Sequence, residues 1–128
     1  MSKVPTHEEI DSRLALDDHS GALELARRRL DDEPDDARAA GVVARSTAVL
    51  TQMYLGRLGG ARRRVRLAMP RERLLWNSMD HRAGFLVSIA EEPTTIEELL
   101  EICGMPALEA LAVLVDLVDR NVLRLEGA

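Results

Sequence analysis

Apolar residues recur every three or four positions along most of the chain, which is the spacing of one face of an α-helix. The first such stretch follows Thr6, whose hydroxyl can open a capping box with the glutamate three residues later. A second covers residues 22–32. A third begins after Asp35 and Asp36, whose charges suit a helix N-terminus, and it reaches about Leu55. The pattern therefore predicts three helices in the first 56 residues.

Three more helices are predicted in the second half of the chain. Ser78 or Asp80 can cap the first of them, and Thr95 begins a second capping-box pattern ahead of a short helix. Gly104 can take the left-handed conformation that ends this short helix, and a final helix is expected over 106–119, with a proline in its first turn. The side chains expected to point inward from the first of the three are Phe85, Leu86 and Ile89.

The last two of these helices, joined by a tight turn with glycine, have the form of a helix-turn-helix. Residues 122–125 are long enough for one edge strand, as after the third helix of a winged-helix domain. Only Tyr54, Trp76 and Phe85 are aromatic, and aliphatic side chains typical of helical cores fill the other apolar positions. We therefore expect an all-α fold, a helical bundle with at most one short terminal strand.

Charge divides the chain into three zones. Residues 1–56 carry seven basic and eleven acidic side chains, residues 57–77 carry seven and one, and residues 78–128 carry three and ten. A glycine pair and a proline punctuate the middle zone. The charge pattern predicts an N-terminal helical segment over 1–56, a basic connector over 57–77 and an acidic helical segment over 78–128.

The stretch 20–41 resembles a tetratricopeptide repeat. It has small residues at Ala22 and Ala26, a leucine at Leu30, and an acidic turn over 31–36 that precedes an alanine-rich helix start. The resemblance covers about one and a half repeats, and the Trp and Tyr that usually fill the first helix of the repeat are missing. Because a single repeat cannot bury its own faces, the resemblance implies a segment that leans on other helices, most simply on those of the C-terminal part.

A second resemblance covers about residues 8–125. The strings LTQMY over 50–54, MDHRAGFL over 79–86 and GMPALEAL over 104–111 are similar to a recurrent unit of small helical proteins in myxobacteria and related predatory or social bacteria. In that group a tetratricopeptide-like segment precedes a degenerate winged helix, and similar C-terminal helices follow the PATAN-type domains of bacterial regulators. The resemblance implies an adaptor or regulatory role, with no catalytic residues to carry over.

The final predicted helix is poorly suited to read DNA. A recognition helix offers Arg, Lys, Asn or Gln to base edges. Residues 106–119 contain none of these and carry Glu109, Asp116 and Asp119, which would repel phosphates. Nucleic-acid binding is therefore disfavoured, and a DNA-binding transcriptional regulator that uses the helix-turn-helix is the alternative hypothesis.

The basic connector carries the strongest binding signal. We favour the hypothesis that its arginines pair with the acidic zones on both sides or are simply solvated; the alternative is that they bind an acidic protein, nucleic acid or anionic lipid. Tyr54 and Trp76 either pack in the core or anchor a partner helix. The candidate partner-binding residues are Arg62, Arg63, Arg64, Arg66, Tyr54 and Trp76.

No motif indicates an enzyme, a metal site or a cofactor. The three histidines, His7, His19 and His81, stand in different local contexts, and the single cysteine, Cys103, is expected to be a buried core thiol. Asp80 next to His81 is expected to be a helix cap followed by a surface or inter-domain histidine, in preference to a general base. No apolar run is long enough to cross a bilayer and no secretory signal begins the chain, so we expect a cytoplasmic protein without membrane insertion.

The leading hypothesis is a non-enzymatic protein-interaction adaptor or regulator in bacterial cytoplasmic signalling, with motility or polarity control as one setting. The expected partner is a protein, either acidic or an amphipathic helix. Self-association is a third hypothesis, because a second copy could complete the half-repeat.

Overall fold

The computed structural model describes residues 4–74 and 79–127 of the 128-residue chain. Within these ranges the protein is mostly helical, with seven helices and a small antiparallel sheet of three strands, so the all-α expectation is confirmed in its main feature. The chain divides into two compact units, which we call unit 1 (Met1–Gln52) and unit 2 (Met53–Ala128). Neither unit has, in its described part, a helix that is long and apolar enough to cross a membrane.

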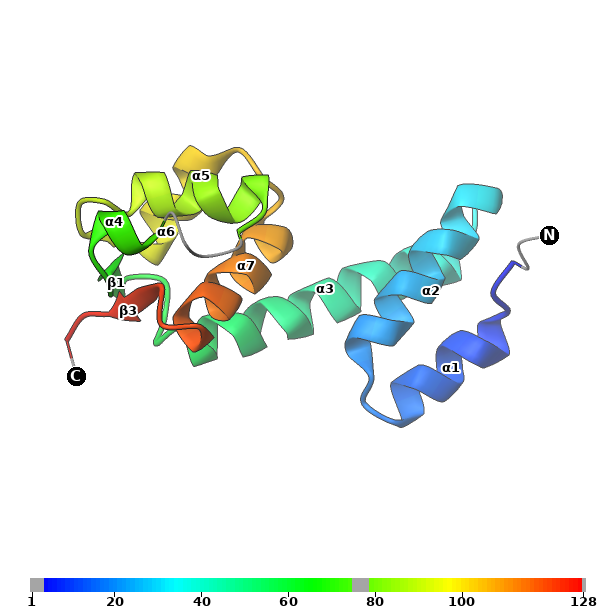
Figure 1. Cartoon of the computed structure of the whole chain (residues 1–128). Coiled ribbons are helices and arrows are strands. Elements are labelled where there is room, and N and C mark those ends of the chain that lie inside the picture. The colour runs from blue at the N-terminus through cyan, green and yellow to red at the C-terminus, as the bar shows by residue number, and fades with distance from the viewer. Residues whose placement is uncertain (1–3, 75–78, 128) are drawn as a thin grey trace. The chain divides into compact units, whose positions relative to one another are not determined.

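Unit 1 is built from α1 (His7–Ala15), α2 (His19–Asp32) and the first part of α3 (Ala37–Arg57), as the apolar spacing predicted (Figure 1). The Thr6 hydroxyl accepts a hydrogen bond from the Glu9 amide at 3.1 Å, which confirms the predicted cap. α2 begins three residues earlier than expected, because the Asp18 carboxylate accepts from the Gly21 amide at 2.9 Å and so starts the helix before the glycine.

The core of unit 1 is small and rich in alanine. α1 and α2 pack closely, since the buried positions of α2 are filled mainly by short side chains. The buried residues of this core are Ile10, Ala22, Ala26, Ala39 and Val42. The likeness of this unit to a tetratricopeptide repeat stays a prediction.

Unit 2 holds the sheet and four helices. Its elements are β1 (Arg64–Leu67), α4 (Arg71–Leu74), α5 (His81–Ile89), β2 (Thr94–Thr95), α6 (Ile96–Cys103), α7 (Ala107–Asp119) and β3 (Leu123–Leu125). β1 is the central strand and pairs antiparallel with β2 on one side and β3 on the other. In Figure 1, β1 and β3 lie together at one side of the unit, next to α4. β3 is the short terminal strand that the sequence predicted.

The segment 57–77, interpreted from its charge as a connector, contains β1 and α4. In β1 two arginines alternate with Val65 and Leu67, and Val65 is fully buried in the core of unit 2. This alternation is the signature of a strand with one buried face. The high charge of the segment obscures this strand pattern in the sequence, because only every second residue of β1 enters the core.

The caps predicted in the second half of the chain are present. Asp80 accepts from the Ala83 amide at 2.9 Å, and Thr95 accepts from the Glu98 amide at 3.2 Å. Phe85, expected to point inward from α5, is instead 45% exposed, whereas Leu86 is fully buried and Ile89 is half-buried. The reason is geometric: the inward face of α5 is set by Leu86 and its neighbours at spacings of three and four, which leaves Phe85 at its edge.

Gly104 ends α6 with φ 71°, in the left-handed region. We expect Gly104→Ala to cost about 1–2 kcal/mol of stability, because the added Cβ meets open space but the backbone conformation penalises an L side chain. Gly84→Ala, in the middle of α5, is a matched control of opposite sign. Its Cβ also meets no atom within 4 Å, so it should stabilise the protein by about 0.5–1 kcal/mol. Urea denaturation followed by circular dichroism checks both, and a neutral or stabilising Gly104→Ala would contradict the assignment.

Candidate partner-binding site

Two of the four candidate arginines lie side by side on the exposed face of β1. Arg64 and Arg66 are exposed, while Val65 between them is fully buried, so both arginines project from the face of the sheet that is turned away from the core. The strand thus places these two arginines of the basic segment in a row on one face of the sheet. The structure places Arg62 in the turn before β1, where it is also exposed.

Arg124, which the sequence alone does not mark as a site residue, belongs to the same face. It is exposed, it alternates with two inward-facing leucines of β3, and it lies directly opposite Arg66 in the register of the sheet. We call Arg64, Arg66 and Arg124 together the arginine face. The alternation of Leu123, Arg124 and Leu125 was visible in the sequence, but nothing local showed that this strand pairs with the basic segment.

The arginine face carries little compensating charge. The Arg66 guanidinium forms an ion pair with Glu126 at 3.3 Å. In the described ranges, Arg64 and Arg124 make no ion pair. The face therefore keeps an excess of positive charge in a chain whose formal charge is −5.

Arg63 behaves differently from its neighbours. It is half-buried, its aliphatic part and guanidinium lie against Gly59, and its carbonyl accepts from the Ile96 amide at 3.0 Å. Its Nε is buried without a hydrogen-bond partner in the described part of the chain. Arg63 thus contributes to local packing and does not lie on the arginine face.

The two aromatic candidates do not join the arginines. Tyr54 is half-buried and packs against the core of unit 2, which is the core-packing alternative for this residue. Trp76 lies outside the described residues, so its assignment as an anchor stays a prediction.

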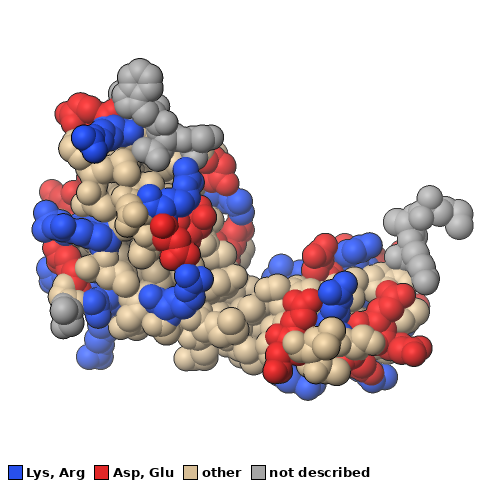
Figure 2. All heavy atoms as spheres, turned by 60° about the horizontal axis from the view of Figure 1, so that its bottom comes forward, with Lys and Arg blue, Asp and Glu red and all other residues tan. Residues whose placement is uncertain are grey.

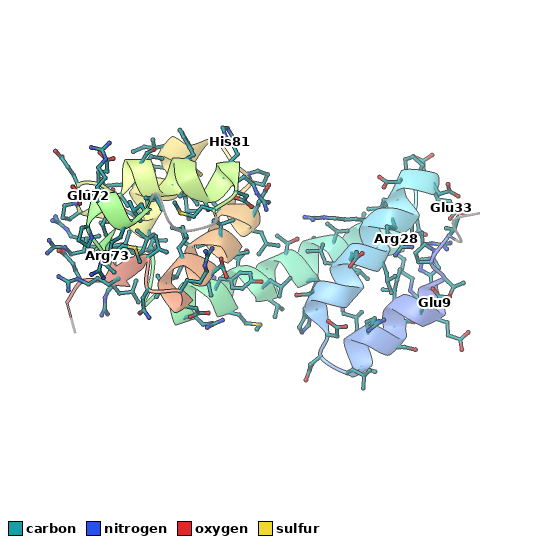
Figure 3. The ribbon with its side chains drawn as sticks, in the orientation of Figure 1. Glu9, Arg28, Glu33, Glu72, Arg73 and His81 are labelled. Carbon is teal, nitrogen blue, oxygen red and sulfur yellow. The ribbon has the colours of Figure 1, made fainter. Side chains whose placement is uncertain are left out.

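Other arginines of the segment 57–77 pair with acidic residues of unit 2. Arg57 pairs with Asp119 at 2.8 Å, and Arg71 pairs with Glu91 at 2.6 Å. Arg73 follows Glu72 on α4, and Figure 3 labels both residues. Internal pairing therefore holds for Arg57, Arg66 and Arg71, whereas Arg62 and Arg64 make no ion pair in the described residues.

A hollow between the start of α5 and α7 is lined by charged side chains that bond to one another. Arg82 of α5 bonds to Asp80 at 3.1 Å and also to Glu109 of α7. These hydrogen bonds, first that to Glu109 and then that to Asp80, raise the pKa of the Arg82 guanidinium. Arg120 pairs with Asp116 on α7 at 3.5 Å. The arginines near the exposed face of α7 thus bond to carboxylates of the protein itself.

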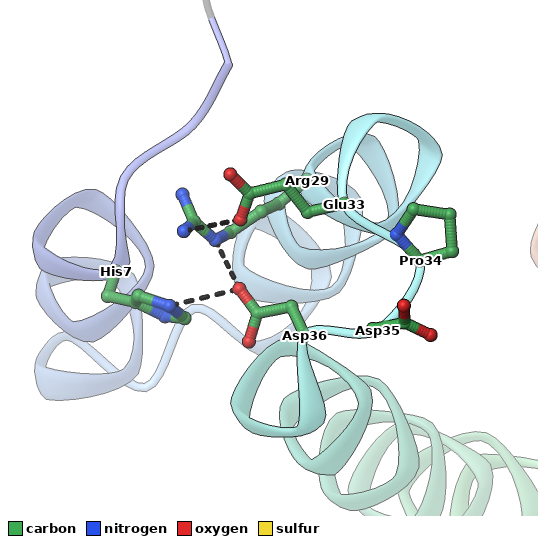
Figure 4. Close-up of a pocket in the computed structure, with 6 residues that line it drawn as sticks. All are labelled: His7, Arg29, Glu33, Pro34, Asp35 and Asp36. Carbon is green, nitrogen blue, oxygen red and sulfur yellow. Dashed lines mark hydrogen bonds and ion pairs between the residues drawn. The ribbon is translucent and has the colours of Figure 1, made fainter.

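Unit 1 contains an open polar hollow of about 570 Å³ between the start of α1 and the α2–α3 turn (Figure 4). Asp36 lies at its centre, 2.5 Å from the Arg29 Nε and 3.0 Å from the His7 Nε2. Arg29 also donates to the Pro5 carbonyl at 2.8 Å and to Glu33 at 2.9 Å. These bonds tie the three helices of unit 1 together, so the hollow is structural in character.

The same bonds set the ionisation of the central pair. The pKa of Asp36 is lowered, chiefly by the hydrogen bond from Arg29 and then by that from the Ala39 amide, and the pKa of Arg29 is raised by the same bond to Asp36. In the folded protein Asp36 is therefore held as a carboxylate.

We expect Asp36→Asn to lower the melting temperature at pH 7, because the amide can still cap α3 at Ala39 but loses the charge that pairs with Arg29 and His7. The contribution of the carboxylate is present above its ordinary pKa of 3.8 and is lost as the pH falls through its lower value in the folded state.

The difference in melting temperature between wild type and Asp36→Asn should therefore close in acid, as circular dichroism from pH 7 down to about pH 2 would show. Asp35→Asn, at the exposed neighbouring position, is the control and should change little at any pH. A difference that stays constant with pH would argue against this role of Asp36.

The chemically reactive side chains do not converge. His7 lies in the hollow of unit 1, and His81 is exposed at the start of α5, as Figure 3 shows. Cys103 is buried at the end of α6, in keeping with a core thiol. Over residues 4–74 and 79–127, no group of three or more His, Cys, Asp or Glu side chains is arranged to hold a metal ion.

Surface charge is mixed on the side of the molecule seen in Figure 2, where basic and acidic side chains are interspersed over both units and no continuous basic surface forms.

Comparisons of the chain with models of protein families, with curated proteins and with solved structures found no match.

Proposed function

We propose that this chain is a non-enzymatic adaptor that binds an acidic protein partner through the arginine face of unit 2. The observation that carries the proposal is the exposed set of Arg64, Arg66 and Arg124, of which only Arg66 has an acidic partner in the described residues. Guanidinium groups form forked, charge-assisted hydrogen bonds with carboxylates, which makes arginine well suited to such recognition.

The charge of the surrounding unit supports a protein partner over nucleic acid. Unit 2 carries ten basic and eleven acidic side chains, and α7 contributes carboxylates to its exposed side. Each carboxylate near a phosphate backbone repels the phosphates. It therefore opposes an association that the release of counterions would otherwise drive. An acidic protein segment, in contrast, can bind the arginine face without contacting the carboxylates of α7.

The element order of unit 2 supports the same role. Helices α5, α6 and α7 and strand β3 follow one another in the order predicted for a winged-helix-like unit, with the Gly104 turn between α6 and α7, and unit 1 is the half for which a likeness to tetratricopeptide repeats is predicted. In this proposal both halves serve protein contacts in bacterial cytoplasmic signalling, with motility or polarity control as one setting. The resemblance to small regulatory proteins of myxobacteria is in keeping with it.

Affinity capture from nuclease-treated extract of the source bacterium tests the proposal. Wild type should retain a protein partner that Arg64→Glu/Arg66→Glu loses. The matched control is Arg27→Glu/Arg45→Glu, which reverses two exposed arginines of unit 1 that form no ion pair in the described part and should leave capture unchanged.

Association that nuclease abolishes would support the alternative, a DNA-binding regulator, for which the α6–α7 helix-turn-helix is the favouring observation. Capture that is equal for wild type and Arg64→Glu/Arg66→Glu would contradict binding through the arginine face.

A further inference from the structure

We infer that the partner lies on the arginine face as an extended segment with acidic residues at alternate positions, and that Arg124, opposite Arg66, is a further binding residue of this site. The inference rests on the proposed function and adds the conformation and charge spacing of the partner. It follows from the geometry of the sheet.

The arginine face presents its charges at strand intervals. Arg64 and Arg66 are two residues apart on one strand, so their Cα atoms are about 6.8 Å apart. Arg124 lies directly across from Arg66 on β3, about 5.5 Å away for a hydrogen-bonded pair. An extended segment repeats its side chains on one side at the same interval as Arg64 and Arg66, so alternate carboxylates match that row.

The opposition of Arg66 and Arg124 gives a reason to expect an anion there. Like charges directly opposite each other across an antiparallel pair destabilise a sheet. The Glu126 carboxylate compensates the charge of Arg66, at 3.3 Å from its guanidinium, but Arg124 has no acidic partner in the described ranges. A carboxylate placed between the two guanidinium groups would remove the repulsion that the free protein carries.

The other polar groups at this edge of the sheet do not replace such a partner. Thr95 of β2 lies opposite Arg64, and its hydroxyl caps α6. The Glu98 carboxylate is bonded to the hydroxyls of Thr94 and Thr95, at 3.3 and 3.0 Å. This carboxylate belongs to the start of α6.

The test uses two peptides of equal composition, Thr-Glu-Thr-Glu-Thr-Glu-Thr and Glu-Thr-Thr-Glu-Thr-Thr-Glu, of which only the first has glutamates two positions apart; each is titrated into the full chain and followed by amide chemical shifts in NMR. We expect the alternating peptide to bind about five- to tenfold more tightly and to shift the amides of β1 and β3. Arg64→Thr should lose this preference, because it removes one charge of the row on β1. Arg124→Thr should weaken binding of the alternating peptide, and Arg45→Thr, at an exposed site in α3, should change neither.

The thermal stability of Arg124→Thr gives an independent readout. Because the variant removes a like-charge pair and threonine favours strands, its melting temperature should equal or exceed that of wild type. Loss of binding together with loss of folding would therefore contradict the assignment.

The outcomes separate the inference from the proposed function. Equal binding of the two peptides, or no binding of either, overturns the extended alternating partner, while capture of an arginine-dependent protein would leave the adaptor proposal standing. Binding of a 16-base-pair DNA duplex through Arg124, with no binding of either peptide, would overturn both.

Discussion

Reversing the three charges of the arginine face, with Arg64→Glu, Arg66→Glu and Arg124→Glu combined, is expected to weaken binding of the captured protein partner by about 100-fold or more. A 100-fold loss corresponds to about 2.8 kcal/mol. Exposed ion pairs contribute about 0.2–1 kcal/mol each, and reversal adds repulsion to the loss of attraction. The measurement is a titration by isothermal calorimetry or fluorescence anisotropy with the partner identified by affinity capture.

The folded state should survive these three substitutions, because the three side chains are exposed and the inward face of the sheet is unchanged. Far-UV circular dichroism should match that of wild type, and Arg27→Glu/Arg45→Glu should bind as wild type does. A loss of less than about threefold, with folding intact, would show that the partner binds elsewhere.

Truncating Leu111 to alanine is expected to destabilise unit 2 by about 2–5 kcal/mol, because removal of a buried side chain loses its transfer free energy and leaves a cavity. Leu111 is fully buried on α7, in the same core as Leu86 and Val65. Since that core also holds the inward face of β1, the variant should disorder the arginine face along with the helices.

Urea denaturation followed by circular dichroism measures this effect as a lower midpoint. The control is Ile102→Ala on α6, which removes a side chain that is 59% exposed and should cost less than about 0.5 kcal/mol. A small effect of Leu111→Ala, comparable to that of the control, would mean that α7 does not pack as described.

Local features of the fold could be predicted well from the sequence. The caps at Thr6, Asp80 and Thr95 and the left-handed glycine at Gly104 depend on residues within a few positions of one another, so their patterns are readable in one dimension. The apolar spacing of α3 and α7 is equally local. These features sufficed for the fold class.

Non-local features were missed. β1 was not recognised because a four-residue strand becomes evident only through its pairing with β2 and β3, which are distant in the sequence. For the same reason Arg124 was not grouped with Arg66. The candidate site was therefore predicted in part, as a run of arginines, while its arrangement as one face of a sheet required the structure.

The most direct test of the central claim is photo-crosslinking in living cells from position 62, next to the arginine face. Arg62→p-benzoylphenylalanine is compared with the same substitution at Arg45, which is also exposed. Binding of an acidic protein by this face predicts a crosslinked product from position 62 that protease degrades and nuclease leaves intact, with none from position 45. A nuclease-sensitive product, or the same protein crosslinked from both positions, would contradict it.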